Sequence, residues 1–411
     1  MHTKIIFMEI KTVIIVNDFG FVNGGAGKIA ISTALGLAEN GYRVIFFCAV
    51  GPVGKELIHP NIQVICTNQL DILHDSNKIR AIKQGLWNIK AKKIFKEILN
   101  FNKPENTVIH FHAWIKALSP SILSLKQLRQ YKICITLHDF FLYCPNGGLY
   151  IYPKKKICNY EPMSCKCIFC NCDSRSYFQK VWRVIRQFVQ NRQLKKLTST
   201  TFISISELSE SLLNTKFGLI PYSVVRNNNP IDAPLAINES EPKNLYLFMA
   251  RLSSEKGLDL FCQAIDECNV KGCVIGDGYL KDFYKSKYSK IIFPGWLSGV
   301  EKIQYIQKTK FFVFPSKLYE TFGLSVAEML SYGVPCIVSN TSAAKELIED
   351  GKSGFIFQNG NIDSLKETIK KAEQADWLFM HNYIKKNFHV NSYSMHSHIN
   401  RLVNIYSKSK S

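Results

Sequence analysis

Short runs of β-branched and aromatic residues alternate with longer amphipathic stretches along most of the chain. Such an alternation is typical of βαβ units, in which parallel strands form one sheet and the connecting helices cover it. In the first half, the pattern predicts strands at 11–16, 43–48, 62–66, 107–111, 132–137 and 201–205. A second series of strands is predicted at 244–249, 272–275, 290–293, 310–314, 335–339 and 354–357. The sequence therefore predicts an α/β fold with two parallel sheets.

The two series of strands are separated by residues 226–244, a polar, proline-containing stretch without hydrophobic periodicity. This composition indicates a linker, and 411 residues are enough for two domains of ordinary size. We expect two Rossmann-like domains facing across a cleft, at 1–230 and 231–395, with the last segment, 396–411, packing back on the first domain. Parallel sheets bind ligands at the carboxyl ends of their strands, so the active site is predicted in the cleft.

The composition narrows the class of protein. Apolar residues make up 46% and charged residues 20% of the chain, which excludes a disordered or low-complexity protein. No uninterrupted apolar stretch reaches the ~18 to 20 residues of a membrane-spanning helix, and the start lacks the features of a signal peptide. We therefore expect a cytoplasmic protein whose 13 cysteines are thiols or metal ligands rather than disulfides.

Positive charge is concentrated in the first half of the chain. Residues 1–230 contain 30 Lys and Arg against 13 Asp and Glu, whereas residues 231–411 contain 22 against 19. A basic surface attracts nucleic acid, an anionic membrane or a phosphate-bearing substrate, and charge alone does not choose among them. A general enrichment of the sequence in lysine accounts for the same charge without any partner.

Four glycines follow the first predicted strand, at Gly20, Gly24, Gly25 and Gly27. A helix is predicted to begin near Lys28, and glycines before a helix let backbone N–H groups approach an anion closely. A phosphate-binding P-loop is excluded, because Val22 stands where that motif needs glycine and Ile29 where it needs Ser or Thr. The G-x-G-x-x-G motif of dinucleotide-binding proteins is absent as well. The glycine pattern fits two interpretations, an anion site of another kind and a plain strand-to-helix turn.

Two cations, Arg251 and Lys256, follow the strand predicted at 244–249. Cations at the carboxyl end of a strand suit a diphosphate, because Arg binds as a two-pronged donor and Lys as a point charge. Solvated surface charges would give the same pattern.

The segment from 314 to 328 gives the strongest signal. It leaves a strand, places Glu320 in a loop and starts a helix near Gly323 or Leu324. The free N–H groups at such a helix start can hold a phosphate. Glu328 falls in an apolar part of this helix, where an unpaired carboxylate is costly, so it needs a partner, and ligand hydroxyl groups would serve.

Taken together, these residues resemble the retaining, nucleotide-sugar-dependent glycosyltransferases of family 4, in glycosyltransferase group 1, which have the two-domain GT-B fold. The resemblance runs over essentially the whole chain. It rests on Gly24-Gly25, Thr136-Leu137-His138-Asp139, Ala250-Arg251-Leu252, Glu255-Lys256-Gly257, Gly276-Asp277-Gly278 and the glutamates Glu320 and Glu328. The segments Ala343-Ala344-Lys345-Glu346 and Gly354-Phe355 also stand where the family has similar segments.

The resemblance implies roles for individual residues. The first domain would bind the acceptor and the second the nucleotide-sugar donor. His138 and Glu320 would be the catalytic residues, both contacting the donor sugar. The implied donor-binding residues are Gly25, Arg251, Lys256, Phe322, Gly323, Leu324, Ser325 and Glu328. His110 and His112 lie at the end of another strand. The sequence leaves open whether they are core residues or act directly in the site.

By the same resemblance, the enzyme transfers a hexose-type sugar to a saccharide acceptor with retention of configuration and requires no cofactor or metal for catalysis. The basic first half suggests a lipid-linked acceptor, in the synthesis of bacterial O-antigen, capsule or lipopolysaccharide. The alternatives are a GT-B sugar phosphorylase or a nucleotide-sugar epimerase. A nucleic-acid-binding protein is a remote alternative, because charge does not explain the two glutamates or the glycine loops.

An insertion at 144–172 departs from the family pattern. It contains six cysteines, Cys144, Cys158, Cys165, Cys167, Cys170 and Cys172. A structural zinc ion would take four thiolates, and the predicted ligands are Cys158, Cys165, Cys170 and Cys172. Reduced thiols packed in a small core, or redox chemistry, are the alternatives. Because the insertion follows His138, we expect it to shape the acceptor site.

The stretch 175–197 combines basic and apolar side chains. The basic residues are Arg175, Lys180, Arg183, Arg186, Arg192, Lys195 and Lys196. A basic helix with aromatic residues is typical of an element that lies on an anionic membrane leaflet, here the cytoplasmic face of the inner membrane. A surface helix packed by its apolar stripe is an equal alternative.

Overall fold

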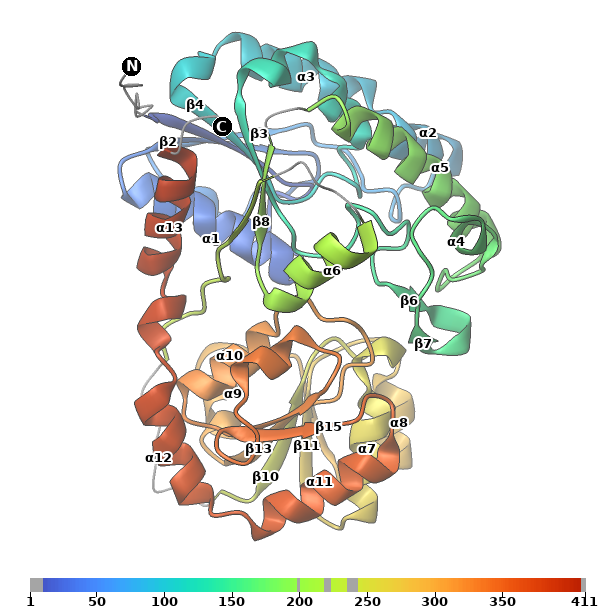
Figure 1. The fold of residues 1–411 in the computed structure, drawn as a ribbon, viewed down its shortest axis with the longest axis vertical. Helices are drawn as coiled ribbons and strands as arrows, with labels where there is room; N and C mark the ends of the chain where they lie inside the picture. Colours follow the sequence, from blue (N-terminus) through green and yellow to red (C-terminus); the bar gives the residue numbers. More distant parts are fainter. Residues whose placement is uncertain (1–9, 198–199, 218–222, 235–242, 408–411) are drawn as a thin grey trace.

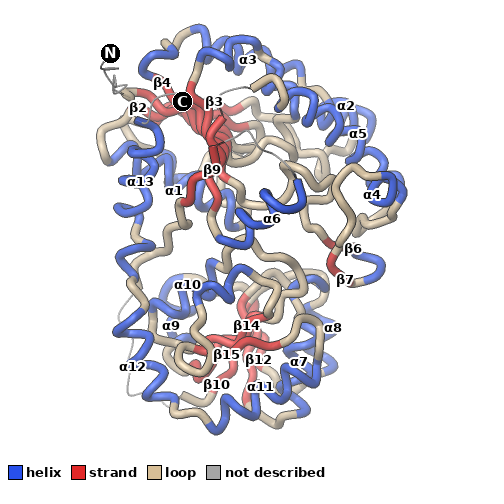
Figure 2. Tube along the Cα trace, in the orientation of Figure 1, coloured by secondary structure: helices blue, strands red, loops and turns tan. Residues whose placement is uncertain are grey.

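The computed structural model describes residues 10–197, 200–217, 223–234 and 243–407. These residues form two α/β domains, one above the other in Figure 1. Each domain contains one parallel sheet with helices on both faces (Figure 2). The predicted fold class is confirmed.

The sheet of the first domain has the strand order β3-β2-β1-β4-β5-β8-β9, and all its neighbouring strands are parallel. Its strands are β1 (Thr12–Val16), β2 (Arg43–Cys48), β3 (Ile62–Cys66), β4 (Thr107–Phe111), β5 (Lys132–Thr136), β8 (Thr200–Ser204) and β9 (Ser223–Arg226). All but β9 match the predicted strands within one residue at each end. The edge strand β9 was not predicted, because its few residues lead directly into the polar linker and show no hydrophobic periodicity.

The sheet of the second domain has the order β12-β11-β10-β13-β14-β15 and is also parallel. Its strands are β10 (Leu245–Met249), β11 (Lys271–Ile275), β12 (Ile292–Gly295), β13 (Thr309–Phe314), β14 (Cys336–Ser339) and β15 (Gly354–Phe357). Each was predicted within two residues. A separate antiparallel pair, β6 (Tyr150–Ile151) and β7 (Lys156–Ile157), lies in the insertion.

Helices cover the two faces of each sheet because alternate strand residues point to opposite sides. The helices of the first domain are α1 (Gly25–Glu39), α2 (Lys78–Leu86), α3 (Ile89–Asn100), α4 (Cys165–Phe169), α5 (Tyr177–Leu194) and α6 (Glu207–Phe217). In the second they are α7 (Leu258–Glu267), α8 (Lys281–Lys287), α9 (Gly299–Ile306), α10 (Leu324–Ser331), α11 (Ile362–Gln374) and α12 (Trp377–Asn387). Val13 and Ile15 pack with α1, whereas Ile14 and Val16 pack with α3.

The last helix, α13 (Met395–Ser407), returns to the first domain and packs against α1 (Figure 1). Ile399 and Leu402 of α13 are buried in the same apolar cluster as the inner face of α1. The hydroxyl of Tyr406 also lies 2.6 Å from Nδ1 of His110 in β4. The chain therefore crosses between the domains twice.

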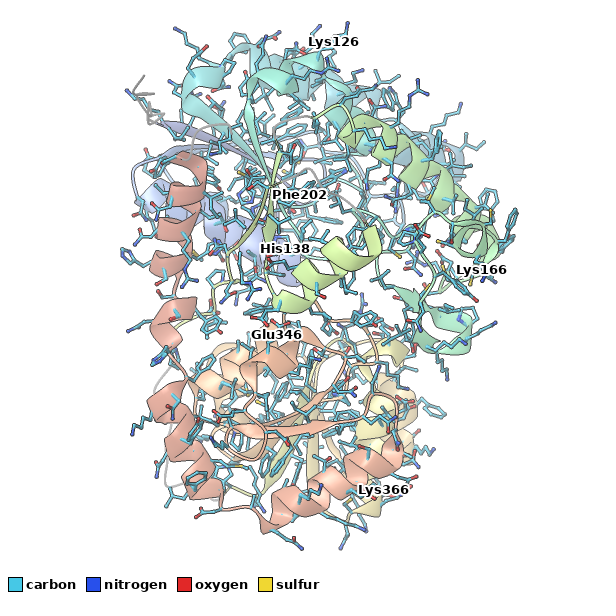
Figure 3. The ribbon with its side chains drawn as sticks, in the orientation of Figure 1. Lys126, His138, Lys166, Phe202, Glu346 and Lys366 are labelled. Carbon is cyan, nitrogen blue, oxygen red and sulfur yellow. The ribbon has the colours of Figure 1, made fainter. Side chains whose placement is uncertain are left out.

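In both sheets the strand order changes direction, next to β1 in the first and next to β10 in the second. Ligands of such sheets bind at these points, beyond the carboxyl ends of the strands. Figure 3 shows His138, which follows β5, on the side of the first domain that faces Glu346 of the second. The Glu346 carboxylate accepts hydrogen bonds of 2.8 and 2.7 Å from the N–H groups of Glu207 and Leu208 at the start of α6.

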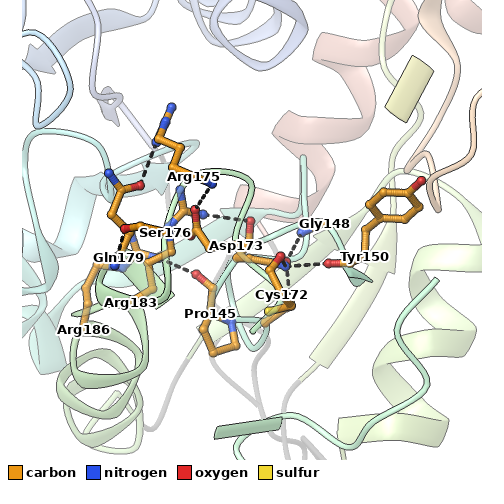
Figure 4. Close-up of polar contacts among 12 residues, drawn as sticks. Pro145, Gly148, Tyr150, Cys172, Asp173, Arg175, Ser176, Gln179, Arg183 and Arg186 are labelled. Carbon is orange, nitrogen blue, oxygen red and sulfur yellow. Dashed lines mark hydrogen bonds and ion pairs between the residues drawn. The ribbon is translucent and has the colours of Figure 1, made fainter. Parts of the chain in front are cut away.

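Helix α5 turns its polar side chains toward the protein. Its buried side chains are Lys180, Arg186, Gln187, Gln190 and Gln193. Three of them donate to carbonyl groups of the irregular segment after β5: Arg186 to Pro145 at 3.0 Å (Figure 4), Gln187 to Leu142 at 2.9 Å and Gln190 to Phe141 at 2.8 Å. Arg183 is likewise engaged, with Nε 2.9 Å from the buried Asp173 carboxylate.

The outward face of α5 is apolar instead. It exposes Phe178, Val181, Ile185 and Phe188, which follow one another at helical spacing. Of the basic residues predicted to face a membrane, Lys180, Arg183 and Arg186 therefore do not, because their donors bind groups of the insertion and Asp173, which directly follows it. Arg175, Arg192, Lys195 and Lys196 are exposed.

Candidate active site

The facing ends of the two sheets are held together by direct contacts. The Thr321 hydroxyl donates a hydrogen bond of 2.8 Å to the carbonyl of His138. The rings of Tyr319 and Phe140 lie edge to face, 6.5 Å apart. The loop that carries Glu320 is thereby placed beside the end of β5. The two residues predicted as catalytic, from opposite domains, thus lie on facing sides of one interdomain site.

Helix α10 begins at Leu324 without a side-chain cap. Gly323 precedes it with a φ of 100°, and a Cβ there would lie only 2.7 Å from the Cβ of Ala344, so glycine is required. The first turn contains no acidic residue. The N–H groups of Leu324 and Ser325 can therefore bind an anion, as the predicted phosphate site requires.

The start of α1 meets the start of α10. The helix was predicted near Lys28 but begins at Gly25, because the small residues ahead of Lys28 let the helix start earlier. Gly24 precedes it with a φ of 85°, and no side chain caps it. A Cβ on Gly25 would lie 3.1 Å from Cδ1 of Leu324. Two uncapped helix N-termini, one from each domain, thus adjoin the same space.

Lys256 and Glu320 form an ion pair in this site. Nζ of Lys256 lies 2.6 Å from Oε1 of Glu320, and the Ser316 hydroxyl donates to the same oxygen at 2.6 Å. Burial raises the pKa of Glu320, but Lys256 and Ser316 together outweigh it, so the pKa lies below its usual value. Glu320 is therefore a carboxylate at pH 7, and its second oxygen can accept from a ligand.

Arg251 lies on the same loop and is mostly exposed. Its Nη2 atom is 2.9 Å from Oε1 of the buried Glu255, which also accepts a hydrogen bond of 2.7 Å from the Ser253 hydroxyl. Glu255 thus orients the guanidinium from one side. The remaining N–H groups of Arg251 can bind phosphate oxygens.

Glu328 was expected to need a partner because of its apolar surroundings. In the structure that partner is a lysine of the protein itself. The Oε1 atom of Glu328 accepts a hydrogen bond from Nζ of Lys302, which extends from α9. Lys302 was not predicted, because the two residues are 26 positions apart on separate helices and no local pattern connects them. Ligand hydroxyl groups are therefore not needed to satisfy Glu328, although its other oxygen can still accept from a ribose.

Phe322, also predicted at the donor site, has a packing role. Its ring is buried with Ile205 of the first domain and Ala327 of α10. This apolar contact joins the two domains next to the start of α10.

The three predicted histidines belong to two neighbouring strands: His110 lies in β4, His112 directly follows it, and His138 follows β5. His110 is buried, with its ring nitrogens 2.6 and 2.7 Å from the hydroxyl groups of Tyr406 and Thr136. Nδ1 of His112 lies 2.8 Å from Nε2 of His138. Burial lowers the pKa of His138 to about 3 and the pKa values of His110 and His112 well below 6.5, so all three rings are neutral at pH 7. His110 is a core residue, whereas His112 contacts the predicted catalytic residue.

Three of the four predicted zinc ligands lie in one cluster, and the fourth does not. In the part of the chain that the structure describes, no three His, Cys, Asp or Glu side chains are placed to hold a metal ion. Cys158 and Cys172 are buried in one cluster and the half-buried Cys170 packs against it, but Cys165 is exposed on α4. The buried ammonium group of Lys180 lies beside these thiols and would repel a zinc ion. Zinc at these cysteines stays a prediction.

The second domain is similar to a known protein family. Residues 233–389 match the family described as glycosyl transferases group 1. This match spans the second domain from β10 to α12. The chain is 28% identical over 158 residues to an uncharacterized 41.2 kDa protein in the cps region of Klebsiella pneumoniae, a match that covers 36% of this chain and 44% of the relative.

Two further relatives have specific names. A GDP-mannose-dependent alpha-mannosyltransferase of Corynebacterium glutamicum is 27% identical over 180 residues, covering 43% of this chain and 42% of the relative. UDP-Gal:alpha-D-GlcNAc-diphosphoundecaprenol alpha-1,3-galactosyltransferase of Escherichia coli is 26% identical over 140 residues, covering 32% and 35%. The chain thus spans less than half the length of these curated relatives.

Solved structures match nearly the whole chain and show that its fold is GT-B. Sucrose-phosphate synthase from Thermosynechococcus elongatus superimposes with a TM-score of 0.69 at 16% identity, covering 96% of this chain and 98% of that one. Anabaena Alr3699/HepE in complex with UDP-glucose gives a TM-score of 0.65 at 15% identity, covering 97% and 100%. WaaG, a glycosyltransferase involved in lipopolysaccharide biosynthesis, gives 0.65 at 12% identity, with the same coverage.

The buried histidines predict how the stability of this GT-B protein depends on pH. Burial lowers the pKa values of His110, His112, His138 and His398. Below pH ~6.5 the unfolded chain binds protons that the folded chain does not, so acid favours unfolding by up to about 1.4 kcal/mol per pH unit for each histidine. We expect the free energy of unfolding, measured with urea, to fall steadily from pH 7 to pH 5.

A matched variant tests the cause of this pH dependence. His398 lies in α13 and contacts the Thr33 hydroxyl at 3.2 Å. His398→Gln should reduce the pH slope by about a quarter, because one of four protons is no longer bound on unfolding. A stability that is flat between pH 7 and pH 5 in the unchanged protein would contradict the neutral state of these histidines.

Proposed function

We propose that this protein is a retaining glycosyltransferase that transfers a sugar from a nucleoside diphosphate donor to a saccharide acceptor. The observation that carries the proposal is the meeting of the uncapped N-termini of α1 and α10 beside Arg251 and the Lys256–Glu320 pair. This arrangement combines an anion site with a carboxylate for sugar hydroxyl groups, and a nucleotide sugar requires both together.

The donor would bind with its diphosphate at the two helix N-termini and Arg251. Glu328, oriented by Lys302, would accept hydrogen bonds from the ribose hydroxyl groups. Glu320 would accept hydrogen bonds from the transferred sugar, and His138 would contact the same sugar from the other domain.

The reaction breaks the bond between the anomeric carbon and the diphosphate oxygen and forms one between that carbon and the acceptor oxygen. Negative charge grows on the diphosphate, where helix N–H groups, Arg251 and Lys256 stabilise it. The acceptor hydroxyl attacks from the face that the diphosphate leaves, and its proton passes to a diphosphate oxygen, which retains the configuration. Because these fixed positive groups already stabilise the leaving group, we expect turnover without a divalent metal.

The acceptor we propose is a lipid-linked saccharide of bacterial surface polysaccharide synthesis. Support comes from the basic first half of the chain and from two relatives, the protein of a cps region and the diphosphoundecaprenol-dependent galactosyltransferase. Such an acceptor keeps its reacting sugar near the cytoplasmic face of the inner membrane, so the first domain would have to reach that surface.

Helix α5 is the element that would contact the membrane. Its exposed apolar face carries Phe178, Val181, Ile185 and Phe188, and the exposed basic residues around it are Lys166, Arg175, Arg192, Lys195 and Lys196. An apolar stripe bordered by cations suits an anionic leaflet, where the stripe enters the headgroup region and the cations meet lipid phosphates. In the described parts of the chain, no helix has the length and apolar character to cross a bilayer.

A test of the enzyme begins with a thermal-shift screen of nucleotide sugars, since a bound donor raises the unfolding temperature. With the donor identified, Glu320→Ala should lower kcat for sugar transfer by about a hundredfold or more, because the carboxylate that orients the sugar is lost. The measurement is transfer of labelled sugar to an acceptor, with and without EDTA and without inorganic phosphate.

Glu373→Ala is the matched control for this variant. Glu373 also pairs with a lysine of the second domain, with Oε1 2.9 Å from Nζ of Lys310, but it lies away from the interdomain site. Full activity of Glu320→Ala would rule out the proposed role of Glu320. Turnover that needs phosphate, or no acceptor, would favour a phosphorylase or an epimerase instead.

Membrane contact is tested by sedimentation with vesicles. We expect binding to anionic vesicles at low salt, release at high salt and little binding to neutral vesicles, because screening weakens the cationic contribution. Replacing Phe178 and Phe188 by Ser should weaken binding, whereas Phe283→Ser with Leu378→Ser, at exposed positions of the second domain, should not. Equal binding to neutral and anionic vesicles, or none to either, would contradict the proposed contact.

A further inference from the structure

His112 and His138 form a hydrogen-bonded pair of imidazole rings. His112 follows β4 and is buried, and its backbone N–H donates to the carbonyl of Val16 at 2.9 Å, which holds it beside the end of β1. Nδ1 of His112 lies 2.8 Å from Nε2 of His138, and the ring centroids are 5.1 Å apart. The two rings therefore share one hydrogen bond in the interior of the first domain.

The proton in this bond can belong to either ring. Burial lowers the pKa values of both residues, so each neutral ring carries one N–H group and one acceptor nitrogen. If His138 donates, His112 must carry its own proton on Nε2. If His112 donates from Nδ1, its Nε2 is an acceptor.

The surroundings of His112 decide between these arrangements. Its Nε2 atom is buried and has no hydrogen-bond partner among the residues that the structure describes. The small pocket that His112 lines is bounded mostly by apolar side chains, including Ile115, Ile135 and Leu142. A buried N–H group without an acceptor is rarer in proteins than an acceptor without a donor, so the arrangement in which His112 donates is favoured.

We propose that His112 is a positioning residue, whose Nδ1–H group donates to Nε2 of His138 and thereby keeps the proton of His138 on Nδ1. That Nδ1 atom points away from His112, because Nδ1 and Nε2 of an imidazole lie on different edges of the ring. His138 then offers a neutral N–H donor to an oxygen atom of the transferred sugar, a statement that rests on the proposed function.

The proton positions can be measured without any activity. In protein labelled with ¹⁵N at histidine, NMR should show His138 protonated on Nδ1 and His112 protonated on Nδ1, with both Nε2 atoms unprotonated. A His138 ring protonated on Nε2 would overturn the proposal, whether or not the protein transfers sugar.

Two substitutions test the consequence for transfer. His112→Asn can place a side-chain N–H group near the position of Nδ1, so it should keep kcat within about threefold of the unchanged protein. His112→Leu removes the donor and should lower kcat about tenfold or more with little change in KM for the donor, as the loss of orienting partners does at metal-bound histidines. The ¹⁵N spectrum of His112→Leu should show His138 in a mixture of tautomers.

The controls separate this proposal from the proposed function and from misfolding. His381→Leu removes another buried imidazole, whose Nδ1 atom lies 2.9 Å from the carbonyl of Gly333, and should leave kcat unchanged. An unchanged kcat and an unchanged His138 tautomer in His112→Leu would overturn the positioning role. Full kcat in His138→Ala would overturn the role of His138 in the proposed function. The tautomers of His112 and His138 in the unchanged protein would still be measured independently by NMR. If His112→Leu does not fold, the tautomers of the unchanged protein and of His112→Asn decide.

Discussion

Backbone N–H groups at the starts of α1 and α10 face the same space between the domains, and no side chain caps either helix. Parallel sheets create this situation, because every strand ends and every following helix begins on the same edge. Unpaired N–H groups need an acceptor, and a diphosphate supplies several. Gly25 and Gly323 follow from the same constraint, since a side chain at either position would press against the opposite domain or a neighbouring loop.

The charges around this site are paired with one another. Lys256 pairs with Glu320, and Lys302 with Glu328, and in each pair both side chains are largely shielded from water. A partly buried charge is stable only with a partner, so the pairs hold the carboxylates in place before a donor arrives. In the proposed function, the second oxygen of each carboxylate serves the hydroxyl groups of the donor, which links the stability of the folded site to its chemistry.

The segment that leads from β5 into the insertion imposes a different constraint on α5. Residues 141–146 lie outside any strand or helix, and buried Arg and Gln side chains of α5 donate to their carbonyl groups. The polar face of the helix is therefore turned toward the protein, and its apolar residues point outward. The surface that we propose for membrane contact is therefore a consequence of how this segment is held.

The strand pattern, the two sheets and the helix start at Leu324 could be predicted from the sequence, because hydrophobic period and glycine placement are local properties of the chain. Arg251 and Glu320 could be named from the motifs that follow their strands, and His138 from the resemblance to a known family. The pairing of Lys302 with Glu328, the inward polar face of α5 and the contact between His112 and His138 are seen only in the tertiary structure. Each joins separate elements, and partners of this kind are chosen by packing and by the cost of burying an unpaired polar group, which no local pattern records.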